Sequence, residues 1–107
     1  MWFKVIHLPL LKVNGMALFP FILVRKAAHK ADPLLINHEK IHLAQQLELL
    51  ILPFYMLYLL HYIINLTRYR EHDKAYRNIV FEREAYLMES RQEYLKSRSF
   101  WAWINFL

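Results

Sequence analysis

The chain contains no cysteine and only one glycine, and each shortage removes several kinds of functional site. Without cysteine there is no disulfide, no thiolate metal site and no cysteine nucleophile. Gly15 alone cannot supply a GxGxxG or Walker phosphate loop, because each needs more than one glycine. Any metal must therefore be held by histidine and carboxylate side chains.

Long blocks of one charge are also missing, although 14 basic residues outnumber 9 acidic ones. Over residues 67–98 the two signs alternate, which is typical of a solvated helix face rather than a nucleic-acid-binding arm. We therefore expect no nucleic-acid partner. The apolar stretch after Lys4 is broken by His7, Pro9 and Lys12 and has no small-residue cleavage site, so we expect no signal peptide and a cytoplasmic location.

Apolar residues are abundant, at 57% of 107 residues. This length fits a single domain over residues 1–107. A strand is expected over residues 2–8, followed by a turn at Asn14-Gly15 with positive φ. Residues 17–25 resemble a second strand, which Pro20 should confine to an edge or bulge.

Helices follow the strands, so the sequence predicts an α+β fold. Asp32 and Pro33 are a typical N-cap and first helical residue, and the helix should run from Leu34 to Leu52, where Pro53 ends it. The later elements are expected to be an apolar helix, a polar loop or short helix and an amphipathic helix, over residues 54–66, 67–77 and 81–98.

A metal-binding motif lies inside the first predicted helix, where residues 38–42 read HEKIH. Residues four apart share a helix face, so His38 and His42 can bind one ion, while Glu39 can reach a metal-bound water without binding the metal. The same spacing also fits two ordinary histidines on an amphipathic helix. Gln45 lies on the same face and could hydrogen-bond a ligand.

A catalytic zinc needs a third protein ligand, and residues 43–52 contain no further histidine. Two carboxylates, Glu82 and Glu84, lie at the start of the last helix. They are two residues apart and point in different directions, so only one of them can be a ligand. Glu82 shares a stripe with Ala85, whose small side chain would let this helix lie close to the motif helix.

HExxH on one helix and ExxA on a second resemble the gluzincin branch of zincin metallopeptidases, and the chain is most similar to the minimal members of that branch. The resemblance implies a zincin-like domain in which an N-terminal β-hairpin precedes the motif helix. It implies one zinc ion held by His38, His42 and Glu82, with Glu39 as the general base. It also implies that an edge strand, here residues 17–24, binds a peptide or protein substrate. The aspartate that usually follows the alanine is Tyr86 here.

The implied activity is zinc-dependent hydrolysis of peptide bonds. The alternative is a non-catalytic protein, either small and membrane-associated or a zinc-stabilised binding module. Such hydrolysis also needs a hydrogen-bond donor that stabilises the developing oxyanion. The candidates are Tyr69, His72, Tyr76 and Tyr86, and the sequence does not choose among them.

Residues 49–66 carry no Asp, Glu, Lys or Arg and are long enough to span a bilayer. A single crossing there would place His38 and His42 on one side and Glu82 on the other, so it conflicts with a shared site. We therefore expect a core helix packed behind the zinc. Peripheral membrane contact through residues 49–66 and 100–107 is a further expectation.

Overall fold

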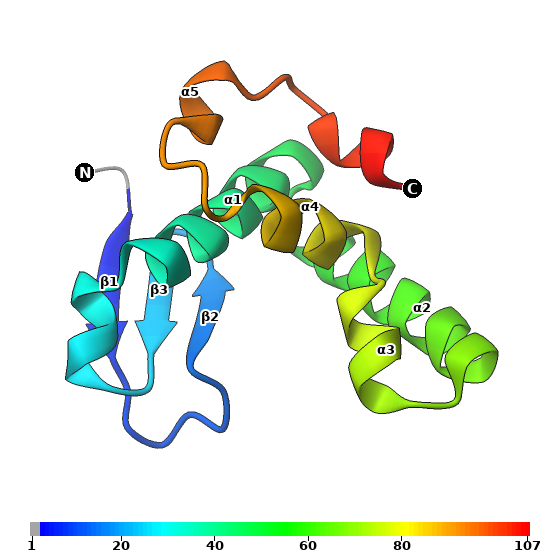
Figure 1. Cartoon of the computed structure of the whole chain (residues 1–107), viewed down its shortest axis with the longest axis horizontal. Coiled ribbons are helices and arrows are strands. Elements are labelled where there is room, and N and C mark those ends of the chain that lie inside the picture. Colours follow the sequence, from blue (N-terminus) through cyan, green and yellow to red (C-terminus); the bar gives the residue numbers. More distant parts are fainter. Residues whose placement is uncertain (1–2) are drawn as a thin grey trace.

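A computed structural model describes residues 3–107 (Figure 1). The elements in chain order are β1 Lys4–His7, β2 Gly15–Leu18, β3 Phe21–Val24, η1 Ala27–Ala31, α1 Pro33–Leu49, α2 Ile51–Tyr69, α3 His72–Arg77, α4 Val80–Met88, α5 Tyr94–Ser97 and η2 Ala102–Phe106. The fold is α+β, as the sequence predicted. In Figure 1 the sheet lies to the left, α1 crosses it, and α2 leads away to the right.

The single strand expected over residues 17–25 is wrong, because the chain turns at Phe19 and Pro20 and forms β2 and β3 instead. Within residues 3–107 the strands form one sheet in the order β1-β3-β2. β3 pairs antiparallel with β2 and parallel with β1, so the hairpin is β2–β3. The first strand was expected over residues 2–8, and Trp2 lies outside the described residues.

The start of α1 follows the prediction, but its end does not. The Asp32 carboxylate accepts hydrogen bonds from the backbone N–H groups of Leu34 and Leu35, at 3.0 and 3.3 Å. The helix ends at Leu49 rather than Leu52, because Leu50 adopts a φ of 65°. Pro53 lies in the first turn of α2, where its missing N–H costs no helical hydrogen bond. The break at Leu50 turns α2 by 111° from α1.

Two apolar clusters lie on either side of α1. The first joins the sheet to α1 and is built from Ala17, Ile22, Val24 and Leu43. The second joins α2 to α4 and is built from Phe54, Ile79, Val80 and Phe81. Trp103 and Phe106 of the C-terminal segment pack against the second cluster, whereas Phe100 and Leu107 are exposed.

The helix α2 buries only one side, so the expected core helix over residues 49–66 is wrong for its outer side. Phe54 and Asn65 are its buried residues, and most of its aliphatic side chains are exposed. Within residues 3–107 no single helix has both the length and the hydropathy to cross a bilayer. Only α1 and α2 taken together have them, and this pair is bent.

The amphipathic helix expected over residues 81–98 is shorter than predicted. It ends at Met88, and only Tyr94–Ser97 return to a helix. The side-chain amide of Asn37 on α1 donates to the backbone carbonyls of Glu89 and Arg91, at 2.8 and 2.9 Å. These long-range bonds satisfy the carbonyls that follow α4, so the chain can turn there.

Candidate metal centre

Three side chains of the predicted site meet between α1 and α4. Glu82 Oε1 lies 3.1 Å from His38 Nε2 and 3.1 Å from His42 Nε2. All three residues are buried, and their ligand atoms lie within 4.8 Å of one another. Ala85, one turn after Glu82, is fully buried. The structure therefore brings His38, His42 and Glu82 together, and the small residue lies where close helix packing needs it.

Gln45 determines which nitrogen of His42 carries the proton when the ring is neutral. Its Nδ1 lies 2.8 Å from Gln45 Oε1. The Gln45 amide nitrogen donates to the Phe81 carbonyl at 3.1 Å and to Glu84 Oε1 at 2.9 Å, so Oε1 must face the histidine. Nδ1 of His42 therefore donates, and in the neutral ring Nε2 presents a lone pair to Glu82. The hydrogen bond that the sequence suggested for Gln45 is thus formed with His42, one of the candidate ligands.

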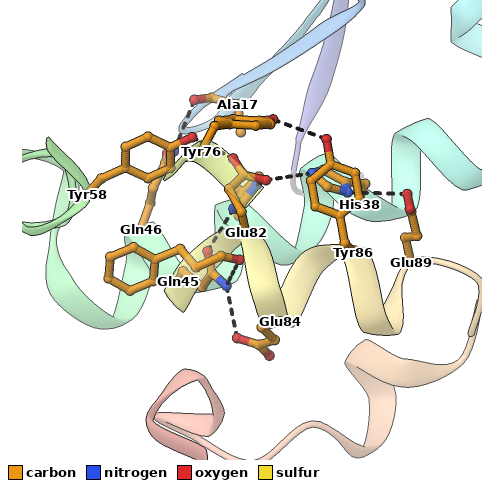
Figure 2. Close-up of polar contacts among 12 residues, drawn as sticks. Ala17, His38, Gln45, Gln46, Tyr58, Tyr76, Glu82, Glu84, Tyr86 and Glu89 are labelled. Carbon is orange, nitrogen blue, oxygen red and sulfur yellow. Dashed lines mark hydrogen bonds and ion pairs between the residues drawn. The ribbon is translucent and has the colours of Figure 1, made fainter. Parts of the chain in front are cut away.

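The orientation of the His38 ring is set by Glu89, a residue that the sequence did not indicate. Glu89 Oε2 lies 3.3 Å from His38 Nδ1, and a carboxylate can only accept (Figure 2). Tyr86 instead packs its ring edge-on against His38, with centroids 4.5 Å apart. The position of Glu89, seven residues after Glu82 and so on the same helical face, could have indicated this role.

Two imidazole lone pairs and one carboxylate oxygen thus point at the same small volume, which favours a cation there. Although burial lowers the pKa of His42, the Glu82 carboxylate outweighs it and raises that pKa to about 9. Burial raises the pKa of Glu82, but the two histidines more than offset it and hold the pKa below its usual value. A metal ion could take the place of the proton. Tetrahedral ligands with bonds of ~2.0 Å lie roughly 3.3 Å apart, close to the nitrogen–oxygen separations here.

Tyr58 on α2 is a further residue of the site that sequence reasoning missed. Its hydroxyl donates to Glu82 Oε2 at 2.6 Å, on the other side of the carboxylate from the histidines. Burial and the neighbouring Glu82 raise the pKa of Tyr58, so it stays a donor. The spacing of Tyr58 from Phe54, one turn earlier on the same helix face, was the available signal.

Glu39 lies beside the three ligands and is buried. It shares a cavity of about 210 Å³ with His42 and Glu82. Burial raises its pKa, and the nearby histidines offset part of this effect. A Cβ atom on Gly15 would lie 3.1 Å from Glu39 Oε2 and 2.9 Å from Leu35 Cδ1. A side chain at this position would make the ends of Leu35 and Glu39 shift, so the glycine lets β2 lie close to Glu39. The positive φ expected at Gly15 is wrong.

The edge-strand prediction for residues 17–24 is only partly right. Residues 21–24 form the central β3, and of the two strands in this range β2 is the one at an edge. The Ala17 carbonyl on this edge already accepts from the Gln46 amide and the Tyr55 hydroxyl. Gly15 is the residue of β2 that lines both cavities beside the cluster.

The four candidate oxyanion donors lie in different places. Among the linings of the two cavities, Tyr76 occurs in both, whereas His72 and Tyr86 occur only in the larger one, of about 590 Å³. Tyr69 lies at the end of α2 and lines neither. Tyr76 is the best placed of the four because it lines both cavities, and its hydroxyl accepts a hydrogen bond from the Tyr86 hydroxyl (Figure 2).

Glu84 faces away from the ligands, as the spacing from Glu82 required. It forms an ion pair with Arg98, with Nε 2.5 Å from Oε2, and Arg98 Nη1 lies 2.7 Å from Glu48 Oε2. All three side chains are almost completely buried. Since Glu84 also holds Gln45, this ion-pair cluster connects the C-terminal segment to His42.

Comparison of the chain with protein-family models, with curated proteins and with solved structures gives no match.

Proposed function

We propose that this protein is a zinc-dependent metallopeptidase of the gluzincin type, with His38, His42 and Glu82 as the ligands and Glu39 as the general base. One observation carries the proposal. Two imidazoles, each with its Nδ1 proton directed at an acceptor, aim their Nε2 atoms at one carboxylate oxygen. With each Nδ1 bonded to its own acceptor, both Nε2 atoms are held towards one position and can bind a metal ion once any proton there is displaced.

The donor set suits zinc, because two nitrogens and one oxygen leave a fourth position for water, as in catalytic sites. When bound, zinc would supply a Lewis acid that lowers the pKa of that water towards ~7. Glu39 would take the proton from the water and pass it to the leaving amine, and its raised pKa suits both steps. Tyr76 would donate to the developing oxyanion.

The chain's own residues also position the substrate in this proposal. Gly15 lies on the edge strand β2 and lines the cavity beside Glu39. Its backbone would pair with an extended peptide, while the occupied Ala17 carbonyl stops that pairing at the next outward-facing residue. The substrate contact would thus be short, and the aromatic wall of Phe54 and Tyr58 would contribute apolar contact.

Substitution of Glu39 by Gln tests the proposal. We expect the variant to keep stoichiometric zinc by metal analysis and to hydrolyse a fluorogenic peptide library about 10²–10⁴-fold more slowly, because the proton acceptor is lost. His42→Ala should lose both zinc and hydrolysis. Glu71→Gln, an exposed carboxylate on the same chain, is the matched control and should change neither. Hydrolysis that persists in Glu39→Gln would favour the alternative, a zinc-stabilised module whose apparent activity comes from elsewhere.

A further inference from the structure

The outer face of α2 is apolar where a surface helix is usually polar. The aliphatic side chains there are between 50% and 71% exposed, and they are Leu52, Met56, Leu59, Leu60, Ile63 and Ile64. No charged residue occurs from position 51 to position 67. We call these six residues the α2 stripe. Apolar side chains gathered in this way on a surface usually mark a place where something binds.

The α2 stripe lies on the opposite side of the helix from the metal centre. With about 100° per residue, Leu52, Met56, Leu59 and Ile63 fall on one side, whereas Phe54 and Tyr58 fall on the other. Phe54 and Tyr58 line the cavity beside Glu82. Figure 1 shows α2 running from behind α4 to the edge of the molecule. A partner on the stripe would therefore leave the cavity open.

The charges at the end of the stripe identify the kind of partner. Arg68 and Arg70 are exposed, and within residues 3–107 neither has an acidic group within 4.0 Å. The next cations along the chain differ, because Lys74 pairs with Glu71 and Arg77 pairs with Asp73. An uncharged apolar stripe that ends in two uncompensated arginines is complementary to an anionic lipid surface.

We propose that the α2 stripe docks this protein onto anionic lipid bilayers, with α2 lying in the plane of the interface. The aliphatic side chains enter the boundary between headgroups and acyl chains, and Arg68 and Arg70 bind lipid phosphates. A second copy fits this face less well, because each copy carries a net charge of +5. This inference does not depend on the proposed hydrolysis, since the stripe contains no residue of the site.

Sedimentation of the full chain with vesicles tests the docking surface. With vesicles of phosphatidylcholine and phosphatidylglycerol we expect most of the wild-type protein to pellet, and much less with phosphatidylcholine alone. The double variant Leu59→Gln, Ile63→Gln should bind the anionic vesicles at least about tenfold more weakly, because two apolar side chains no longer leave water on binding. Arg68→Gln with Arg70→Gln should weaken binding and reduce its dependence on salt.

A matched control and a second measurement keep the test decisive. Leu87 on α4 is 66% exposed, so Leu87→Gln makes the same chemical change away from the stripe and should leave binding unchanged. Circular dichroism and zinc content should be the same in all variants. Equal binding by the wild type and the double variant, or no binding by either, would overturn the proposal. The proposal would also be overturned if the wild type did not bind lipid but formed a dimer in analytical ultracentrifugation, and the double variant did not form that dimer.

Discussion

In most helices apolar side chains are buried and polar ones are exposed, but the inner face of α1 and the outer face of α2 both depart from this pattern. α1 buries polar side chains, namely Asn37, His38, Glu39, His42, Gln45 and Gln46. α2 exposes leucine, isoleucine and methionine and buries little. Adjacent helices in one chain thus place polar groups inside and apolar groups outside.

The difference between these two faces shows where to look for ligands. Buried polar groups are costly unless they are paired, and on α1 the buried amides and histidines have specific partners on α4, the sheet or the segment after α4. On α1 the Nε2 atoms of His38 and His42 converge on one oxygen of Glu82, an arrangement that suits a cation. On α2 the apolar side chains stay exposed to water, which favours contact with a nonpolar phase.

The largest expected effect comes from breaking the buried ion-pair cluster. Arg98→Gln leaves Glu48 and Glu84 buried without a cation, so we expect a loss of about 3–5 kcal/mol in the free energy of unfolding. Leu59→Gln on the exposed stripe should stay within about 0.5 kcal/mol of the wild type. Urea denaturation measures both. A small loss for Arg98→Gln would mean that the polar interior is less tightly held than the geometry indicates.

A smaller effect is expected when only the partner of one ligand is removed. Gln45→Leu leaves His42 Nδ1 without its acceptor, so zinc affinity should fall about 10–100-fold. The neighbouring Gln46 is also buried, but it holds the Ala17 carbonyl and the Phe19 N–H rather than a histidine. Gln46→Leu is therefore the matched control, and competition titrations with a chromophoric chelator should show little change in its zinc affinity.

The smallest effect is the dependence of zinc binding on pH. Because the pKa of His42 is raised to about 9, a proton competes with the metal, and zinc affinity should rise with pH up to about 9. Displacement of one proton gives a change of at most about tenfold per pH unit. The metal-free chain should show the opposite trend. The same raised pKa stabilises its fold below 6.5, the ordinary value, and this stabilisation is lost as pH rises through about 9. Thermal melts with and without a chelator measure both trends.

Local patterns in the sequence predicted the start of α1 and the shared face of His38 and His42, whereas the choice of Glu82 as their partner depended on the resemblance of its ExxA segment to the gluzincins. The cap at Asp32, the four-residue spacing of the histidines and the small Ala85 are all short-range signals. The contacts of Gln45 with His42 and of Glu84 with a group other than the ligands also follow from helical spacing.

The remaining features depend on contacts between distant parts of the chain. α4 ends at Met88 because Asn37, far earlier in the sequence, binds the carbonyls that follow it. Glu89 can reach His38 only because of that turn. Pro53 did not mark the helix end, because a proline fits the first turn of the next helix as well as it ends the previous one. The exposure of α2 depends on what packs beside it, which the hydropathy of residues 49–66 does not specify.

Metal analysis of the purified wild-type protein beside Glu82→Gln tests the metal centre most directly. Because Glu82 joins α4 to the HExxH helix, we expect one zinc per wild-type chain and a large loss of zinc in the variant. Glu71→Gln should retain the wild-type content. A wild-type chain without zinc after incubation with the metal, or a Glu82→Gln chain with unchanged zinc content and affinity, would contradict the three-ligand site.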